Sequence, residues 1–353
     1  MKRLEFARVR SVLIKLLASI FVCLVAVLVP TAIISGKNVL AEKFRHVASY
    51  QGILELWNID TFEGGTASKK SFLTGRAIEF QKQNKGTLVM VKNMTADECL
   101  LALGQGQKPD MFSFGHAFAG KIKECLSLIE CESEIDETVL QSATTNNGLL
   151  AVGYARSAYL LASEQNRLAD LSQKISNQAF VCGKVKQLKN GKKQVTYSLV
   201  CGLASTNSQR AFEENFYPFV AGETTINYDA QKTSYQAYCD FVEGKANILL
   251  GTIRDLVRIK NRESQGKLSD VVFEPFGGYT DLVQYLGICK DISAEKQAVC
   301  KTFINFLVCR ESQSKLAEIG LLSVCETLNL YEEGVLFEVE KNSKNYYVPN
   351  MFE

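Results

Sequence analysis

From residue 52 onward the chain alternates short β-type runs with helical patterns, and this order constrains the fold more than any other feature. The pattern predicts strands at residues 53–57, 87–92 and 109–115, separated by helices around residues 73–80 and 96–103. Leu73, Ala77 and Phe80 recur at the spacing of one helix face. Thr95 and Glu98 form a capping box that begins the second helix. This alternation predicts an α/β fold with largely parallel sheets.

A basic segment followed by a long apolar run opens the chain. The run covers residues 16–35 and carries no formal charge, and five cations against one acidic residue precede it: Lys2, Arg3, Arg8, Arg10 and Lys15, against Glu5. About 20 apolar residues cross a bilayer, and flanking cations stay on the cytoplasmic side. We therefore expect residues 1–41 to be a signal peptide or a signal-anchor hydrophobic helix. The sequence Val39-Leu40-Ala41 favours cleavage, whereas the length of the run favours retention, and both remain open.

The rest of the chain is then expected on the extracytoplasmic face of the cell membrane, anchored or secreted. It is roughly 310 residues long, more than one hydrophobic core usually serves, so we expect two lobes. The whole chain has a net charge of +2, and the leader accounts for more than this. The remainder is near neutral and shows no basic stripe, which argues against a nucleic-acid partner.

Eleven cysteines are present, ten of them beyond the leader. Outside the cytoplasm an even number permits disulfides, and Cys182 with Cys201 is the best candidate pair because the two flank a turn at residues 189–193. Most of the others sit among apolar neighbours, as small hydrophobic residues do. His46 and His116 are the only histidines and neither is near a cysteine pair, so we expect no metal site and no cofactor.

Four stretches along the chain carry the motifs of one known family. They are LELWNIDTFEGG at 54–65, GQKPDMFSFG at 106–115, FVEGKA with LGT at 241–252, and FINFL with ESQSKLAEIG at 303–320. In this order they resemble the extracellular solute-binding proteins of ABC transporters, in particular the sugar-type family 1. The chain is shorter than most members. The residues before Cys23 also lack the small residue of a lipoprotein signal, which leaves the mode of tethering open.

The resemblance implies a two-lobed, periplasmic-binding-protein-like type II fold, in which each lobe is a mainly parallel sheet flanked by helices. It implies an N-lobe of residues 50–152 plus 276–310 and a C-lobe of residues 153–275 plus 311–353. The chain is then expected to cross between the lobes near residues 152–153, near residues 274–275 and within residues 308–320. It further implies that the lobes close on a small organic solute, a carbohydrate, and deliver it to the permease subunits of an ABC importer, without enzymatic activity.

Ligands of open α/β sheets sit beyond the carboxyl ends of the strands, and sugars need aromatic faces with planar polar partners. On these grounds we expect ligand binding by Trp57, Asp60, Glu63, Gly64, Gly65, Ser113, Phe114, Tyr154, Arg156, Arg254, Gly277, Gly278 and Tyr279. Some of these have a second interpretation. Trp57 also suits a core strand, Asp60 and Glu63 a solvated loop, Arg156 an ion pair between the lobes, and Arg254 a surface ion pair.

Other functions stay open beside solute delivery. The protein could present its ligand to a membrane sensor without feeding transport. The adjacent Tyr346 and Tyr347 would suit ferric-ion capture, and pairs of acidic residues would suit a glycosidase. No G-x-S-x-G elbow, P-loop or HExxH motif is present, so an enzyme is not expected.

Overall fold

The computed structural model describes residues 50–131, 134–164, 193–197, 224–227, 233–246, 248–276, 279–344 and 346–352. Apart from residues 83–85, these described residues belong to one compact unit. The leader, the Cys182–Cys201 pair and the glycines at 277 and 278 lie outside the described residues. Within those described ranges, none of the helices is both long and apolar enough to cross a bilayer.

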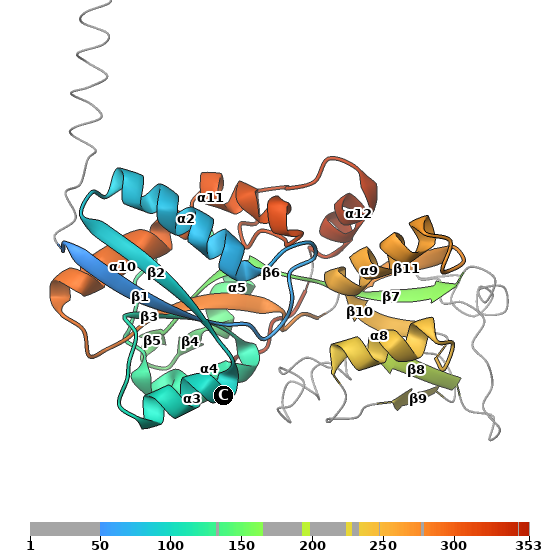
Figure 1. Ribbon diagram of the computed structural model, residues 1–353, viewed down its shortest axis with the longest axis horizontal. Coiled ribbons are helices and arrows are strands. Elements are labelled where there is room, and N and C mark those ends of the chain that lie inside the picture. Colours follow the sequence, from blue (N-terminus) through green and yellow to red (C-terminus); the bar gives the residue numbers. More distant parts are fainter. Residues whose placement is uncertain are drawn as a thin grey trace, which may run out of the picture. The chain divides into compact units, whose positions relative to one another are not determined.

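The first sheet has the strand order β2-β1-β3-β12-β6 (Figure 1). These strands are β1 (Gly52–Ile59), β2 (Thr87–Met94), β3 (Met111–Gly115), β6 (Val152–Arg156) and β12 (Val283–Ile288). β1 pairs in parallel with β2 and β3, which confirms the three strands predicted near the start of the chain. β12 runs antiparallel to both β3 and β6, so this sheet is parallel on one side and antiparallel on the other.

The second sheet has the order β11-β7-β10-β8-β9. Its strands are β7 (Tyr159–Glu164), β8 (Lys193–Tyr197), β9 (Thr224–Asn227), β10 (Ile248–Thr252) and β11 (Val271–Phe276). β8 pairs in parallel with β9 and β10, while β7 is antiparallel to β10 and β11. The predicted α/β class is therefore confirmed, with sheets that mix parallel and antiparallel pairs.

Helices connect the strands as the alternating pattern predicts. The elements outside the two sheets are α2 (Lys69–Gln83), α3 (Ala96–Gly104), α4 (His116–Ile122), η1 (Lys123–Cys125), α5 (Glu137–Ser142), β4 (Thr144–Thr145), β5 (Gly148–Leu149), α8 (Ser234–Val242), α9 (Ile253–Ser264), α10 (Ala294–Val308), α11 (Arg310–Ser314), η5 (Lys315–Ile319) and α12 (Gly334–Asn342). The Thr95–Glu98 capping box of α3 is present with both of its hydrogen bonds. Around the second sheet, Phe241 of α8, Leu249 of β10 and Ile259 of α9 share one buried core.

The chain passes between the two sheets at two places. It leaves the first sheet after Arg156 and enters the second at Tyr159; it leaves the second after Phe276 and re-enters the first at Val283. The predicted crossing near residues 152–153 falls inside β6, and the one near residues 274–275 falls inside β11. The sheet changes lie close to the predicted lobe boundaries, which themselves stay a prediction.

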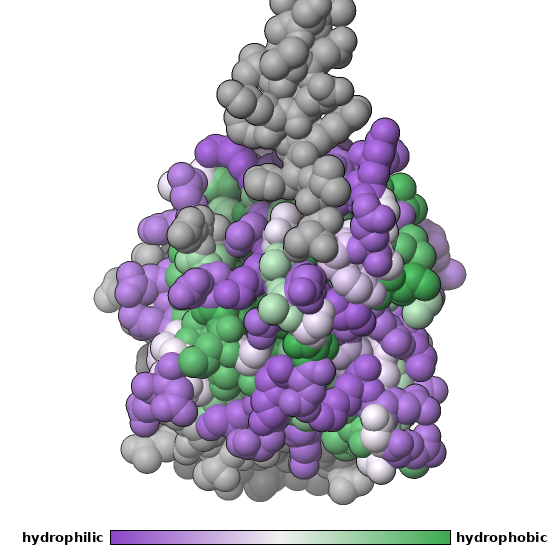
Figure 2. Space-filling model, turned by 90° about the vertical axis from the view of Figure 1, so that its left-hand side faces the viewer, coloured by the Kyte–Doolittle hydropathy of each residue, from purple (hydrophilic) through white to green (hydrophobic). Residues whose placement is uncertain are grey.

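β2 is an edge strand whose side chains alternate between buried and exposed. Leu88 and Met90 are exposed apolar residues on it, and Ile53 is another on the neighbouring β1. Figure 2 shows apolar areas that interrupt a largely hydrophilic face. The alternation is that of a strand with one face on the core and one toward solvent.

A buried glutamine joins three parts of the chain. The Gln313 side chain donates to the carbonyls of Tyr154 (2.8 Å) and Leu307 (3.0 Å). Its Oε1 accepts from the hydroxyl of Ser323 (2.9 Å) and the amide of Val324 (3.1 Å). The segment after α11 is thereby fixed to β6 and to the end of α10.

We expect Gln313→Leu to lower the free energy of unfolding by about 3 kcal/mol or more, because it leaves buried polar groups without partners at roughly 1–3 kcal/mol each. Urea denaturation measures the loss. The control is Gln141→Leu, at an exposed residue that makes one side-chain bond to Glu137; its effect should stay within about 0.5 kcal/mol. Equal losses in the two variants would contradict this account.

Stability should also depend on the protonation of Asp281. This carboxyl is buried, accepts from the Tyr159 hydroxyl at 2.9 Å, and has its pKa raised by burial to about 6. Because the folded state holds the proton more tightly, the stabilisation is complete below the ordinary carboxyl pKa of 3.8 and is lost as the pH rises through 6.

Asp281→Asn stays neutral at every pH and so removes this loss. Relative to the unmodified protein, the variant should gain up to about 3 kcal/mol in unfolding free energy between about pH 4 and about pH 7.5. Denaturation curves at the two pH values measure the difference. A stability difference that is the same at both would show that Asp281 does not titrate in this way.

Candidate functional site

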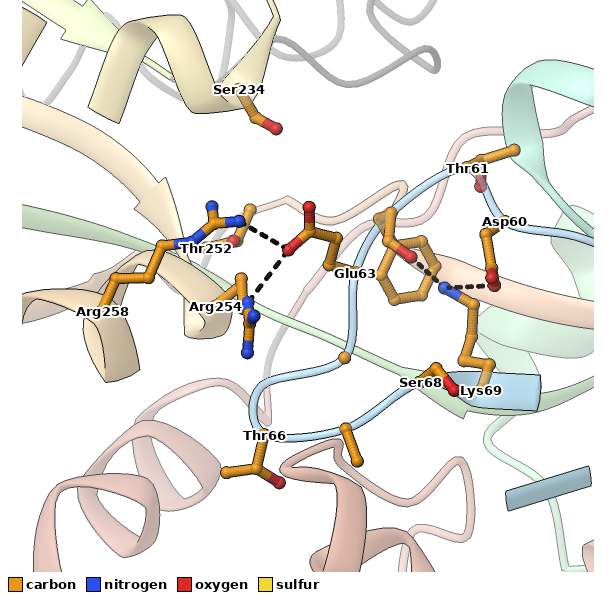
Figure 3. Close-up of a pocket in the computed structure, with 13 residues that line it drawn as sticks. Asp60, Thr61, Glu63, Thr66, Ser68, Lys69, Ser234, Thr252, Arg254 and Arg258 are labelled. Carbon is orange, nitrogen blue, oxygen red and sulfur yellow. Dashed lines mark hydrogen bonds and ion pairs between the residues drawn. The ribbon is translucent and has the colours of Figure 1, made fainter. Parts of the chain in front are cut away.

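A cavity of about 510 Å³ is lined by two groups of residues (Figure 3). The first group belongs to the segment that follows β1, and the second comes from the first residue of α8, the end of β10 and the first half of α9. The lining residues are Asp60, Thr61, Phe62, Glu63, Gly64, Thr66, Ala67, Ser68 and Lys69, with Ser234, Thr252, Arg254 and Arg258. Segments far apart in the sequence thus meet at one polar pocket.

Close backbone contacts determine the path of the segment after β1. The amide of Thr66 donates to the carbonyl of Ile319 (3.1 Å), and its hydroxyl donates to that of Glu318 (3.1 Å). A Cβ on Gly65 would lie 2.6 Å from the carbonyl oxygen of Gly320, which leaves no space for a side chain. Gly320 itself has a φ of 65°, in the left-handed region that favours glycine.

Glu63 bridges two arginines across the pocket. Its Oε2 accepts from Nε of Arg254 at 2.9 Å and from Nη2 of Arg258 at 2.8 Å. Arg254 also donates to the carbonyl of Gly65 at 3.0 Å. Glu63 is 56% exposed, and exposed ion pairs contribute only about 0–1 kcal/mol because water and salt screen them. The ion pairs of Glu63 with the two arginines are therefore weak enough for another anion to take the place of Glu63.

Lys69 is a buried cation on the other side of the pocket. Its ammonium donates to the carbonyl of Phe62, lies 3.7 Å from the centre of the Phe62 ring and lies 3.4 Å from Asp60. Burial lowers the pKa of Lys69 to about 8, and the charge of Asp60 opposes that effect. With this pKa the amine is still mainly protonated at neutral pH, so the pocket holds a third positive charge beside the two arginines.

Several of the predicted residues come together at this pocket. Asp60, Glu63, Gly64 and Arg254 line it, and Gly65 contributes the carbonyl that accepts from Arg254. The predicted surface ion pair of Arg254 is also present, with Glu63 as its partner. A role of these residues in ligand binding stays a prediction.

Trp57 lies elsewhere, inside the first sheet. It is 1% exposed, its Nε1 donates to Glu55 at 2.7 Å, and its ring meets that of Phe112 edge-on at 6.0 Å. β1 has a neighbour on each side, and no face of the indole is accessible to a solute. The core-strand interpretation of Trp57 describes this environment, and the side chain does not line the pocket.

Ser113, Phe114 and Tyr154 are also fully buried in the first sheet and do not line the pocket. The Ser113 hydroxyl lies 2.7 Å from Asn58 and 3.0 Å from the hydroxyl of Tyr154. It also accepts from Gln284 at 3.0 Å. A polar cluster thus lies within the core, at the carboxyl ends of β1 and β3, and it consists of Asn58, Ser113, Tyr154 and Gln284.

Arg156 is buried and donates to the backbone carbonyls of Ser323 (2.8 Å) and Ser343 (3.2 Å), while its guanidinium lies over the ring of Tyr346. Its observed contacts are therefore with backbone carbonyls, the hydroxyl of Ser343 and a ring. Tyr279 is buried and does not line the pocket. The two glycines before it, Gly277 and Gly278, lie outside the described residues.

The tyrosine pair suggested for ferric iron makes other contacts. The hydroxyl of Tyr346 donates to Asp136 at 3.0 Å, and the ring of Tyr347 packs near that of Tyr279 at 6.4 Å. Neither tyrosine lines the pocket. In the parts of the chain that the structure describes, no group of three or more histidine, cysteine or acidic side chains could hold a metal ion.

Sequence reasoning missed Lys69 and Arg258, the two cations that complete the pocket. Arg258 could have been found, because it follows Arg254 at i+4 and such residues share one helix face. Lys69 had no comparable signal, since a lysine at the start of a helix is ordinarily solvated. Its burial depends on the fold of the preceding segment.

Comparison with known proteins shows a likeness in structure alone. No protein-family model matches the chain, and no curated protein matches its sequence. The structure is similar to that of the GacH receptor of Streptomyces glaucescens GLA.O, solved unliganded and in complex with acarbose and an acarbose homolog. The two are 12% identical, with a TM-score of 0.53 over 85% of this chain and 88% of the other. The chain therefore shares its fold with this receptor.

We expect Gly65→Ala to disturb the pocket and destabilise the protein by about 1–3 kcal/mol, as overpacking does. Gly75→Ala is the control, because a Cβ at Gly75 in α2 meets nothing within 4 Å. That change should be neutral or stabilise by about 0.5–1 kcal/mol, since alanine favours a helix over glycine. Urea denaturation of both variants tests this, and a Gly65→Ala protein as stable as the unmodified one would refute the close contact.

Proposed function

We propose that the protein is an extracytoplasmic solute-binding protein that captures a small organic solute, a carbohydrate, and delivers it to an ABC importer. The observation that carries the proposal is a polar pocket lined from two distant parts of the chain, in a fold shared with the GacH receptor. Complexes of that receptor with acarbose make a saccharide the first ligand class to consider.

The chemistry of the lining suits a polyhydroxylated molecule. Hydroxyls of Thr61, Thr66, Ser68 and Ser234 stand around charged groups that can donate to or accept from sugar hydroxyls. Phe62 is the aromatic residue among the described lining residues, and the ammonium of Lys69 already lies over its ring. Binding would therefore depend more on hydrogen bonds and charge than on stacking against an aromatic face.

Capture is better supported than hydrolysis of a glycoside. Glycosidases need one carboxyl group that donates a proton and a second that acts as base or nucleophile. Asp60 is paired with Lys69, and Glu63 with Arg254 and Arg258. Both pocket carboxyl groups thus already face cations, an arrangement suited to holding charge and poor for donating a proton.

The proposed mechanism is closure around the solute. A ligand that contacts both the segment after β1 and the ends of α8 and α9 binds best when these are close together. Its differential affinity for that state shifts the population toward it. The cationic and apolar leader would keep the protein outside the cytoplasmic membrane, where an importer could take over the bound solute.

A thermal-shift screen of monosaccharides and oligosaccharides, acarbose included, tests the binding proposal. A true ligand at a hundredfold excess over its Kd should raise the free energy of unfolding by about 2.7 kcal/mol. Ser234→Trp, which puts an indole at the pocket lining, should abolish this shift. Ser264→Trp, at an exposed residue near the end of α9, should preserve it. Stabilisation by amino acids or polyamines, with none by any saccharide, would contradict the proposal.

Transport is tested in the producing cell. Deletion of the protein should abolish uptake of the identified solute, and restoring it should restore uptake. If uptake continues unchanged while a response to the solute is lost, the protein serves a sensor and the transport part of the proposal is wrong.

A further inference from the structure

The pocket has an excess of positive charge, and the exposed side chain of Glu63 is paired with two of its cations. Three cations, Lys69, Arg254 and Arg258, face two carboxylates, Asp60 and Glu63. Asp60 is paired with Lys69 at 3.4 Å. Both arginines share Glu63, and a single oxygen of that carboxylate accepts from both. If the Glu63 side chain rotated away, two guanidinium groups would face the pocket without this partner.

The arginines have other contacts that hold them when Glu63 leaves. Arg254 donates to the carbonyl of Gly65. Arg258 pairs with Asp255 at 3.4 Å, and its guanidinium lies 5.1 Å from the ring centre of Tyr235. Asp255 is itself buried and bonded to the amide of Thr252 at 2.9 Å. The arginine pair is therefore positioned by Gly65 of the segment after β1 and by residues of α8 and α9, and not by Glu63 alone.

Glu63 differs from its partners in how freely it can move. Its side chain is 56% exposed, against 33% for Arg254 and 20% for Arg258. An exposed ion pair is weak because water and salt screen it, and the released glutamate regains rotamer freedom. A ligand carboxylate held by the rest of the pocket would gain hydrogen bonds of the stronger, charge-assisted kind, which arginine often makes in bidentate form.

From these contacts we infer that the solute is an acidic saccharide, whose carboxylate replaces that of Glu63 between Arg254 and Arg258. Glu63 acts as an internal competitor that occupies the arginine pair in the absence of solute. A neutral sugar offers the two guanidinium groups only hydroxyl oxygens, which are weaker partners than the carboxylate of Glu63. This inference rests on the proposed function and adds to it the class of solute.

Calorimetric titration of the full-length protein tests the inference with matched probes. The probes are disaccharides and trisaccharides that contain a uronic acid, each compared with its methyl ester, which has the same sugar and no charge. We expect at least one acid to bind at least about tenfold more tightly than its ester, which corresponds to about 1.4 kcal/mol or more.

Variants of Glu63 and of the two arginines show whether Glu63 competes with the solute or contacts it. Glu63→Gln should increase the affinity for the acid about threefold to tenfold, because the internal competitor is weakened. Arg254→Gln and Arg258→Gln should each lower it at least about tenfold. Glu79→Gln and Lys82→Gln, which break an exposed ion pair on α2 away from the pocket lining, should leave it unchanged. If one arginine variant does not fold, the other and the ester comparison still decide.

The outcomes separate this inference from the proposed function. Equal affinity for acid and ester, or tight binding of neutral sugars alone, would overturn the acidic solute and leave saccharide capture standing. A loss of affinity in Glu63→Gln would show that Glu63 contacts the solute and is not its competitor, which also overturns the inference. If no saccharide of either kind binds, the proposed function fails with it.

Discussion

The insertion of β12 between β3 and β6 is the constraint on which the pocket depends. This strand comes from residues 283–288, far along the chain, yet it occupies an interior position in the first sheet. Gln284 on β12 donates to the carbonyl of Ile59, the last residue of β1, and to the hydroxyl of Ser113 on β3. The end of β1, where the pocket segment begins, is thus fixed by a strand from much later in the sequence. The reason is that the buried side-chain amide of Gln284 needs hydrogen-bond acceptors.

The sequence could predict those parts of the fold that have a local signal, such as an apolar run or a helix cap. β1, β2 and β3 are apolar runs, and α3 begins with a capping box. β12 was not predicted, since its sequence VQYLGI contains a buried glutamine and tyrosine and its antiparallel partners lie far away in the chain. Glu63 and Arg254, which line the pocket, were singled out in the sequence because one follows a strand end and the other opens a helix. Trp57 was expected at the cleft, but its side chain is 1% exposed and packs against Phe112 inside the first sheet.

The pocket is organised by charge more than by aromatic surface. The ring of Phe62 is occupied by Lys69, and the two arginines are occupied by Glu63. The Phe62 ring and the two arginines thus each have a partner within the protein. No charged group among the described lining residues is therefore desolvated without a partner, which would cost free energy. Under the proposed function, such a site would select by exchange, because a solute would gain only where it offers a better partner than the one already present.

The contact between Gly65 and Gly320 has a consequence for how such a chain can diverge. A Cβ built on either glycine would come within 3.0 Å or less of backbone at the other, and Gly320 also needs its positive φ. A mutation at one position cannot be absorbed by a rotamer change, since the obstacle is main chain. The lineage of this protein would therefore keep both glycines or rebuild the two segments together. New ligand preferences would arise by exchanging the side chains around a fixed backbone.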